Sequence, residues 1–401
     1  MLWMASAVST VGDGVRMAAL PLLAAAISRD PIAVAAVSFA GQLPWLLTSL
    51  VAGAIADRLN RRTVMWTVDT VRALIVAGLA VMIVLDGLNI TVLCAIAFLL
   101  GTGQTLFDSA SQAVVPTVVP RSALASANGR LMTSRIAINS FVGPPLGGFL
   151  FVVSAALPFL VDAGSFVLAA VLVGLFLTTR GTHSDSKPAV TGRTSLWKDI
   201  GEGLRWISKH ATLRSIGILV AVVNFTQAAT QAILVLFATQ VLRMEEAGFG
   251  VLLASSGIGG LVGGITGSFL RRWISPARLF AATILVTVPI FAILGTTSNA
   301  LVAGLMLALN SFAGITASVL LQTLRQSIVP DHLMARVGSV VSLLAVGIGL
   351  PLGSVAGGLI ADALGLRAPF LLSAVLIALI GLLIPRLSRA FAAMGDDRAH
   401  P

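Results

Sequence analysis

Twelve hydrophobic stretches of about 20 residues each limit what this chain can fold into. Each stretch is long enough to cross a hydrocarbon layer about 30 Å thick as a helix. A backbone inside such a layer must satisfy its own hydrogen bonds, and a helix does so within one segment. The sequence therefore predicts an all-α integral membrane protein. The stretches cover residues 2–27, 33–56, 64–85, 90–114, 126–151, 155–178, 214–240, 247–270, 277–297, 299–323, 336–361 and 367–387.

The basic residues collect in alternate connections between these stretches. Only 10% of the residues are charged, yet the net charge is +10. One side holds Arg58, Arg61, Arg62, Arg121, the seven basic residues from Arg180 to Arg214, Arg271, Arg272, Arg278 and Arg325, and the other holds Arg29, Arg243 and Arg367. Basic residues stay on the cytoplasmic side, so we expect both termini in the cytoplasm of a bacterial inner (plasma) membrane. The basic excess then reflects topology, and no nucleic-acid partner is expected.

The two halves of the chain repeat each other at an offset of 210 residues. Gly147 and Gly148 recur as Gly357 and Gly358, since 357 − 147 and 358 − 148 both equal 210. Two fused repeats in a membrane protein usually bracket a pathway at their interface. The sequence therefore predicts two halves that face each other across a route for a solute.

One long polar stretch, residues 180–213, divides the spans six and six. Within it, residues 195–207 place apolar side chains at helical spacing, which predicts an amphipathic helix on the cytoplasmic face. We thus expect two six-helix bundles related by a pseudo-two-fold repeat. The predicted domains are an N-terminal bundle over 1–179, a cytoplasmic linker over 180–213, a C-terminal bundle over 214–388 and a cytoplasmic tail over 389–401.

The loop after the second stretch carries a glycine, an aspartate and three arginines at fixed spacing. These residues are Gly53, Asp57, Arg58, Arg61 and Arg62. The loop resembles the signature Gly-x-x-x-Asp-Arg-x-Gly-Arg-Arg/Lys of the major facilitator superfamily of secondary transporters, with Asn60 at the inner glycine. Asn adopts the positive φ of a tight turn more readily than other non-glycine residues. The resemblance implies two bundles that rock around a central cavity by alternating access.

The same resemblance implies a gate on the cytoplasmic side. Asp57 is expected to cap the eleventh span and so latch the halves together, and Arg61 to pair with Asp108 in the fourth span. A carboxylate at a helix N-terminus is favoured by about 0.3 to 1 kcal/mol, which suits a latch that must reopen. Alternatively, these charges only enforce topology. The expected gate comprises Gly53, Asp57, Arg58, Arg61, Arg62 and Asp108.

The fifth span contains Gly143, Pro144, Gly147 and Gly148 in the order Gly-Pro-x-x-Gly-Gly. This segment is similar to the core of the signature of the antiporter branch of the superfamily. Proline removes a backbone donor and bends a helix, and glycine lets a neighbour approach closely, so a hinge or a seal against proton leak is expected. Without the other motif, such a segment is more often plain packing. Ser354 stands opposite Pro144 in the repeat, so the kink is expected in the first half only.

Charged residues inside the spans need a reason, because each costs about 2.5 to 3.5 kcal/mol at the bilayer centre. Asp13 and Arg16 lie one turn apart in the first span, where we expect Asp13 to bind and release a proton beside Arg16; a purely structural pair is the alternative. Asp69 and Arg72 form a similar pair near the cytoplasmic end of the third span, where a structural role is expected. Asp162 opens the sixth span, where a gate or a solvated helix end is expected.

A polar stripe in the seventh span predicts the substrate cavity. Asn224, Gln227 and Gln231 share one helical face. Three amides are costly against lipid, so this face is expected to look into the central cavity or a helix contact. Arg135 in the fifth span is expected to anchor an anionic part of a substrate or to pair with Asp13 or Asp108.

Nothing in the sequence indicates an enzyme. The four His residues lie outside the spans, and neither a metal-ligand spacing, a nucleophile elbow nor a phosphate-binding loop is present, so no metal and no cofactor are expected. Residues 124–129 and 158–163 resemble the twelve-span subgroup that includes macrolide, multidrug and enterobactin exporters.

The function predicted is secondary active export of small, partly hydrophobic compounds by proton antiport. The expected partners are the small-molecule substrate, protons and the lipid bilayer, with the protein as a monomer. The alternatives are a narrow-range siderophore or metabolite exporter, a uniporter, and a transporter-like sensor or membrane enzyme.

Overall fold

The computed structural model describes residues 2–58, 61–118, 137–176, 205, 210–270, 273–329, 337–338, 340–385 and 387. All the regular elements in these ranges are helical. Nine helices there are long and apolar enough to cross a membrane, and three shorter apolar helices accompany them. The all-α, twelve-span prediction is confirmed.

The helices of the first half follow the predicted spans closely. They are α1 (Leu2–Ile27), α2 (Pro31–Arg58), α3 (Arg61–Val84), α4 (Ile90–Val118), η2 (Ala137–Val142) continued by α6 (Gly143–Val153), and α7 (Leu157–Phe176). Those of the second half are α9 (Ala211–Leu236) continued by η3 (Phe237–Val241), α10 (Glu246–Leu270), α11 (Pro276–Thr296), α12 (Ala300–Ile328), η4 (Leu343–Gly349) continued by α14 (Leu350–Leu364), and α15 (Ala368–Ile380) continued by η5 (Gly381–Leu383). The amphipathic helix expected over 195–207 lies outside the described residues, apart from Arg205, and the domain boundaries stay predictions.

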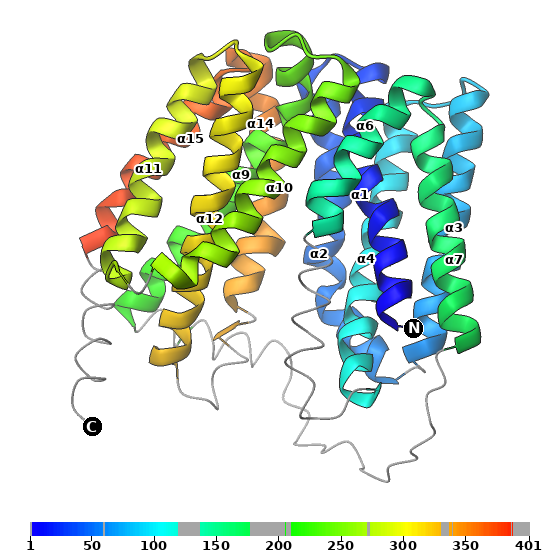
Figure 1. Ribbon diagram of the computed structural model, residues 1–401, viewed down its shortest axis with the longest axis horizontal. Helices are drawn as coiled ribbons and strands as arrows, with labels where there is room; N and C mark the ends of the chain where they lie inside the picture. Colours follow the sequence, from blue (N-terminus) through cyan, green and yellow to red (C-terminus); the bar gives the residue numbers. More distant parts are fainter. Residues whose placement is uncertain are drawn as a thin grey trace.

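Successive helices run in opposite directions, so their ends alternate between two faces of the molecule (Figure 1). We call the face at which α1 begins the N-terminal face, and the other the opposite face. Within each half the corresponding helices pack alike: α1 packs on α6 as α9 packs on α14, and α2 packs on α4 as α10 packs on α12. The predicted repeat is therefore visible in the packing.

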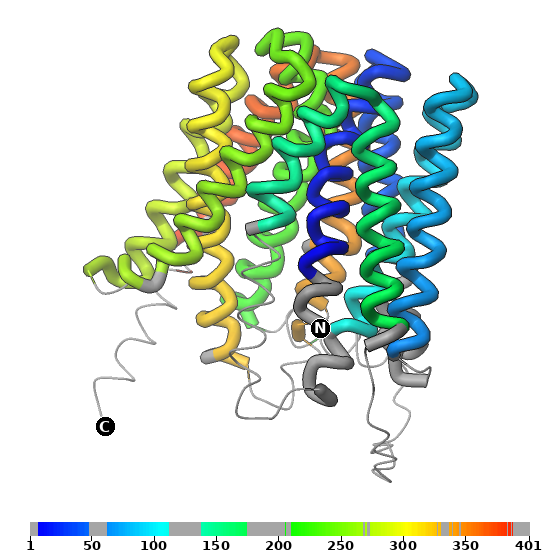
Figure 2. Tube along the Cα trace, turned by 45° about the vertical axis from the view of Figure 1, so that its right-hand side comes forward, coloured from blue at the N-terminus to red at the C-terminus, as the bar shows by residue number. Residues whose placement is uncertain are grey.

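Two helix pairs join the halves. α6 packs on α10, and α14 packs on α2, so each half offers its fifth span to the second span of the other (Figures 1 and 2). We call these contacts the α6–α10 seam and the α14–α2 seam. One apolar core continues across both halves, with Phe159, Phe166, Phe237, Phe280 and Phe370 fully buried in it.

Glycine makes the seams possible. A Cβ atom on Gly148 would lie 2.8 Å from the carbonyl oxygen of Glu246 and 3.2 Å from the Cα of Gly250. A Cβ on its repeat partner Gly358 would lie 3.1 Å from the carbonyl oxygen of Pro31. These distances leave little or no room for a side chain, so the helices meet backbone to backbone.

The preceding glycines hold the same two helices against their own halves. A Cβ on Gly147 would overlap the carbonyl oxygen of Val15 in α1, and one on Gly357 would overlap that of Ala229 in α9. In each half, one short glycine segment therefore packs a helix against two neighbours at once. These two glycine segments are the ones related by the offset of 210 residues in the sequence.

We predict that Gly148→Leu destabilises the folded protein through the α6–α10 seam. Overpacking of a close contact costs about 1 to 3 kcal/mol, so the melting temperature of the purified protein in detergent should fall, as followed by tryptophan fluorescence. Gly164→Leu is the matched control, because nothing lies within 4 Å of a Cβ built there. Equal melting temperatures for the two variants would show that the seam is loosely packed.

Candidate functional site

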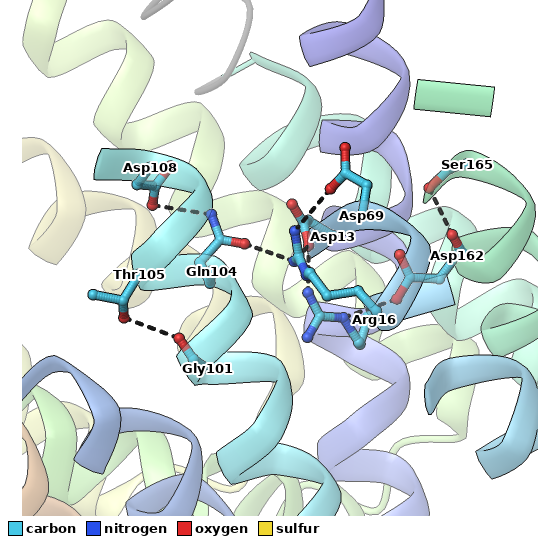
Figure 3. Close-up of polar contacts among 10 residues, drawn as sticks. Asp13, Arg16, Asp69, Gly101, Gln104, Thr105, Asp108, Asp162 and Ser165 are labelled. Carbon is cyan, nitrogen blue, oxygen red and sulfur yellow. Dashed lines mark hydrogen bonds and ion pairs between the residues drawn. The ribbon is translucent and has the colours of Figure 1, made fainter. Parts of the chain in front are cut away.

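A salt-bridge network lies inside the first half. Arg16 pairs with Asp13 one turn earlier on α1 (Figure 3). Its Nε also lies 2.8 Å from Oδ2 of Asp162, which α7 holds fully buried. α1 and α7 are thus joined by charge as well as by packing.

Arg72 extends this network to α3 and α4. Its Nη2 lies 2.6 Å from Oδ1 of Asp13 and donates a hydrogen bond of 2.7 Å to Oε1 of Gln104. Its Nη1 lies 3.7 Å from Oδ1 of Asp69. The Gln104 amide in turn donates a 3.0 Å hydrogen bond to Oδ2 of Asp108 (Figure 3). We call Asp13, Arg16, Asp69, Arg72, Gln104, Asp108 and Asp162 the charge network.

The surroundings of the charge network are apolar and tight. The guanidinium carbon of Arg72 lies 4.0 Å from the centroid of the Phe166 ring, and that of Arg16 lies 5.9 Å away, distances at which a cation and a ring attract. A Cβ on Gly103 would come within 2.9 Å of the Arg72 side chain, and one on Gly12 would overlap Asp162. Small residues therefore leave the space that the charged side chains fill.

The charge network holds more acid than base. Among the described residues, four aspartates face two arginines, and Asp69 and Asp162 are 0% exposed. Neither carboxylate oxygen of Asp69 has a hydrogen-bond partner in the described part of the chain. A buried carboxylate without a hydrogen bond is costly even near a cation, and taking up a proton lowers that cost. The network therefore has the chemistry of a proton-binding site.

The network corrects one expectation from the sequence. Asp162 does not lie at a solvated helix end: α7 begins at Leu157, so Asp162 sits more than a turn inside and pairs with Arg16. Asp69 and Arg72 form the expected pair, and Arg72 also contacts Asp13. The signal available in the sequence was an arginine three residues after an aspartate, present in both the first and the third span.

The predicted gate lies mostly outside the described side chains. Gly53, Asp57 and Arg58 fall within α2 and Arg61 begins α3, but the capping by Asp57 and the pair of Arg61 with Asp108 lie outside what the structure describes. The described member Arg62 donates a hydrogen bond to the carbonyl oxygen of Gly174 in α7. Arg135 also lies outside the described residues.

The expected hinge segment lies between α1 and α10, because Gly143 and Gly147 pack on α1 whereas Pro144 and Gly148 pack on α10. The π-helical turn η2 ends at Val142, and Gly143 and Pro144 begin α6. A proline at this position leaves the carbonyl of residue i−4, Ser140, without its helical donor, and Gly257 of α10 packs against that carbonyl.

The second half has a matching kink, which the sequence comparison missed. The π-helical turn η4 precedes Leu350 and Pro351 at the start of α14. The expectation of a proline kink in the first half only is therefore wrong. Proline stands three residues before Ser354, the position compared with Pro144, so a strict offset overlooks it.

A cavity of about 490 Å³ lies mainly in the second half. α9, α10, α11 and α12 provide most of its wall, and Met17 of α1 and Ser140 of η2 reach it from the first half. The amides Asn224, Gln227 and Gln231 all line it. Their common face thus looks into a cavity of the size that small organic ligands occupy.

A hydrogen bond across the cavity fixes part of its wall. The side-chain nitrogen of Asn310 on α12 donates to Oε1 of Gln227 on α9 at 3.1 Å. The Asn224 amide donates at 2.8 Å to the carbonyl of Val220 in its own helix. The two residues Asn310 and Gln227 are 83 positions apart in the sequence, so their pairing becomes evident only from the fold.

The comparisons with known proteins agree with this architecture. Residues 1–397 match a family described as transmembrane secretion effector. The chain is 28% identical over 399 residues to the multidrug efflux pump Tap of Mycolicibacterium fortuitum, covering 96% of this chain and 95% of that protein.

Two solved structures show the same fold. A bacterial homolog of the human lysosomal transporter Spinster, inward-facing and unoccupied, superposes with a TM-score of 0.74 at 16% identity, covering 98% of this chain and 96% of that one. A bacterial homologue of the iron transporter ferroportin, also inward-facing, gives 0.74 at 18% identity, covering 96% and 97%. At such identities the likeness concerns the fold.

We predict that Arg72→Gln destabilises the protein because Asp13 and Asp69 lose a shared cation. Breaking a buried ion pair from one side costs about 3 to 5 kcal/mol, which thermal unfolding in detergent should detect. Adding Asp69→Asn to this variant removes one unpaired carboxylate and should restore part of the loss. Arg29→Gln, at an exposed arginine, is the control and should unfold like the parent. A double variant no more stable than Arg72→Gln would show that the charge of Asp69 does not depend on Arg72 for its stabilisation.

Proposed function

Because this chain belongs to the transmembrane secretion effector family of the major facilitator superfamily, we propose that it exports small, partly hydrophobic compounds from a bacterial cell by proton antiport. The family and the fold are those of a membrane transporter. Export is supported by the similarity to an efflux pump along nearly the whole chain. Proton coupling is supported by one observation above all, the fully buried Asp69, whose carboxylate oxygens have no hydrogen-bond partner in the described part of the chain.

The charge network lies next to the contact that must change during transport. Asp13 is followed directly by Gly14 and Val15, the residues of α1 on which Gly143 and Gly147 of α6 pack. Protonation of Asp13 weakens its attraction for Arg72, so α1 loses an ionic contact with α3, while Arg16 stays paired with Asp162 of α7. A shift of α1 moves α6, and with it the α6–α10 seam. This route links proton binding to the relative position of the two halves.

The arrangement of the seams supports alternating access. The close approaches at Gly148 and Gly358 lie near the helix ends on the opposite face, and those at Ser140 and Gly257 lie near mid-helix. We infer that this state is closed on the opposite face, as the inward-facing neighbours suggest, with the N-terminal face in the cytoplasm. In the other state the loop of Asp57, Arg58, Arg61 and Arg62 would latch the N-terminal face.

The cavity supplies the substrate site in this proposal. Asn224, Gln227 and Gln231 present amides to the solute, and the apolar part of the wall, which includes Leu253 and Phe291, receives its hydrophobic surface. Arg135 stays a predicted contributor from the first half. A uniporter with the same fold needs no buried acid, so the acid excess favours the antiporter.

We predict that Asp13→Asn abolishes efflux driven by a pH gradient in proteoliposomes while leaving substrate counterflow intact. Asn keeps the size of the side chain but takes up no proton, and counterflow needs only the substrate-loaded transition. Asp86→Asn is the matched control: Asp86 is exposed in the turn after α3 at a φ of 52°, which Asn adopts readily. Retained pH-driven efflux in Asp13→Asn would show that Asp13 does not carry the transported proton.

The predicted orientation has a separate test. We expect a green fluorescent protein fused after Pro401 to be fluorescent in bacterial cells and alkaline phosphatase at the same position to be inactive, because the former folds in the cytoplasm and the latter outside it. The reverse pattern would place the C-terminus outside and overturn the assignment of the N-terminal face to the cytoplasm.

A further inference from the structure

Charged side chains of the second-half membrane helices occur only in the first or last turn of a helix, as Arg214, Glu246, Arg278, Arg325 and Asp362 do. Over residues 215–242, 247–270, 279–324, 337–361 and 368–385 the sequence has no Asp, Glu, Lys, Arg or His. The part of the cavity lining that the described residues provide has none either, including its contributions from Met17 and Ser140. We propose that this cavity binds uncharged compounds that combine apolar surface with hydrogen-bonding groups, and that it rejects permanent cations. The proposal rests on the exporter function and specifies its substrate class.

The wall offers hydrogen-bonding groups that the protein itself does not use. In the described part of the chain, Gln231, Ser256, Ser311 and Ser318 line the cavity without a hydrogen-bond partner. They come from α9, α10 and α12, so donors and acceptors face the cavity from three sides. Such groups are left unsatisfied by a purely apolar solute and are matched by one with its own carbonyl, amide or hydroxyl.

Other polar groups of the wall are already engaged. The hydroxyls of Thr226, Thr283 and Thr287 each donate to a carbonyl of their own helix. Asn310 and Gln227 bond each other. Few polar side chains of the described wall therefore remain available to hydrogen-bond a ligand, and all of these are uncharged.

The charge network offers no counter-ion to a charged ligand. Asp69, Arg72 and Asp162 are buried in the first half at 0 to 1% exposure. Asp13 is already paired with both arginines. An ion entering the cavity would lose water without gaining an opposite charge, a cost that an uncharged solute of the same shape avoids.

A matched pair of fluorescent probes tests this selectivity. Acridone is uncharged and has one donor and one acceptor, whereas 10-methylacridinium has the same three-ring shape and a permanent positive charge. We expect purified protein in detergent to bind acridone with a Kd at least about tenfold lower than that for 10-methylacridinium. Tighter binding of the cation, or no binding of acridone, would overturn the proposal.

Introducing an acid tests whether the cavity wall sets the selectivity. Gln231→Glu should tighten binding of 10-methylacridinium relative to acridone by about tenfold, because the wall gains a counter-ion. Ser318→Asp, on the facing helix α12, should shift the ratio in the same direction. This second variant keeps the test informative if Gln231→Glu does not fold. Gln240→Glu adds the same acid at an exposed position outside the cavity and should leave the ratio unchanged.

The outcomes separate this proposal from the exporter function. An unchanged probe ratio in both Gln231→Glu and Ser318→Asp, with both proteins folded by size-exclusion chromatography, would overturn the cavity assignment. The binding measurement needs no transport. If the parent protein binds acridone selectively but shows no efflux in proteoliposomes, the proposed ligand class stands and only the exporter proposal is overturned.

Discussion

The close backbone contact at the two seams is the constraint on which the rest of the structure depends. Gly148 and Gly358 each let a helix of one half approach the backbone of the other, and the neighbouring Gly147 and Gly357 press the same helices onto their own bundles. A helix held on two sides by backbone atoms has few ways to move. It can slide or tilt as a body, but it cannot absorb motion by side-chain rearrangement. α1, on which Gly147 packs, carries Asp13 of the charge network and Met17 of the cavity wall.

The two halves use this common frame for different chemistry. The first half buries aspartates and arginines in one cluster, and the second half surrounds its cavity with amides and hydroxyls. The element between them is α1. It places Asp13 in the network, Gly14 and Val15 at the contact with α6, and Met17 at the cavity. One helix turn thus touches the proposed proton site, the moving contact and the proposed substrate site.

Sequence alone predicted those features that depend on local pattern. Helix length and hydropathy are local, so the helices that the structure describes agree with the predicted spans to within a few residues at the bounds it describes. The amide stripe is also local, since residues on one helical face share their surroundings. The charge network could not be found this way, because the pairing of Arg16 with Asp162 depends on how α1 and α7 align in space. The kink at Pro351 was missed because this proline stands three residues before the position that the offset of 210 assigns to it, while the glycines Gly357 and Gly358 keep that offset.

The separation of charges has an electrical consequence. If one proton enters for each uncharged molecule that leaves, each cycle carries one net positive charge across the membrane. The membrane potential then drives export together with the proton gradient, at about 2.3 kcal/mol per 100 mV. With an uncharged substrate and a proton-binding network, the transport cycle is therefore electrogenic. The membrane potential can then drive export even in a cell whose interior and surroundings have the same pH.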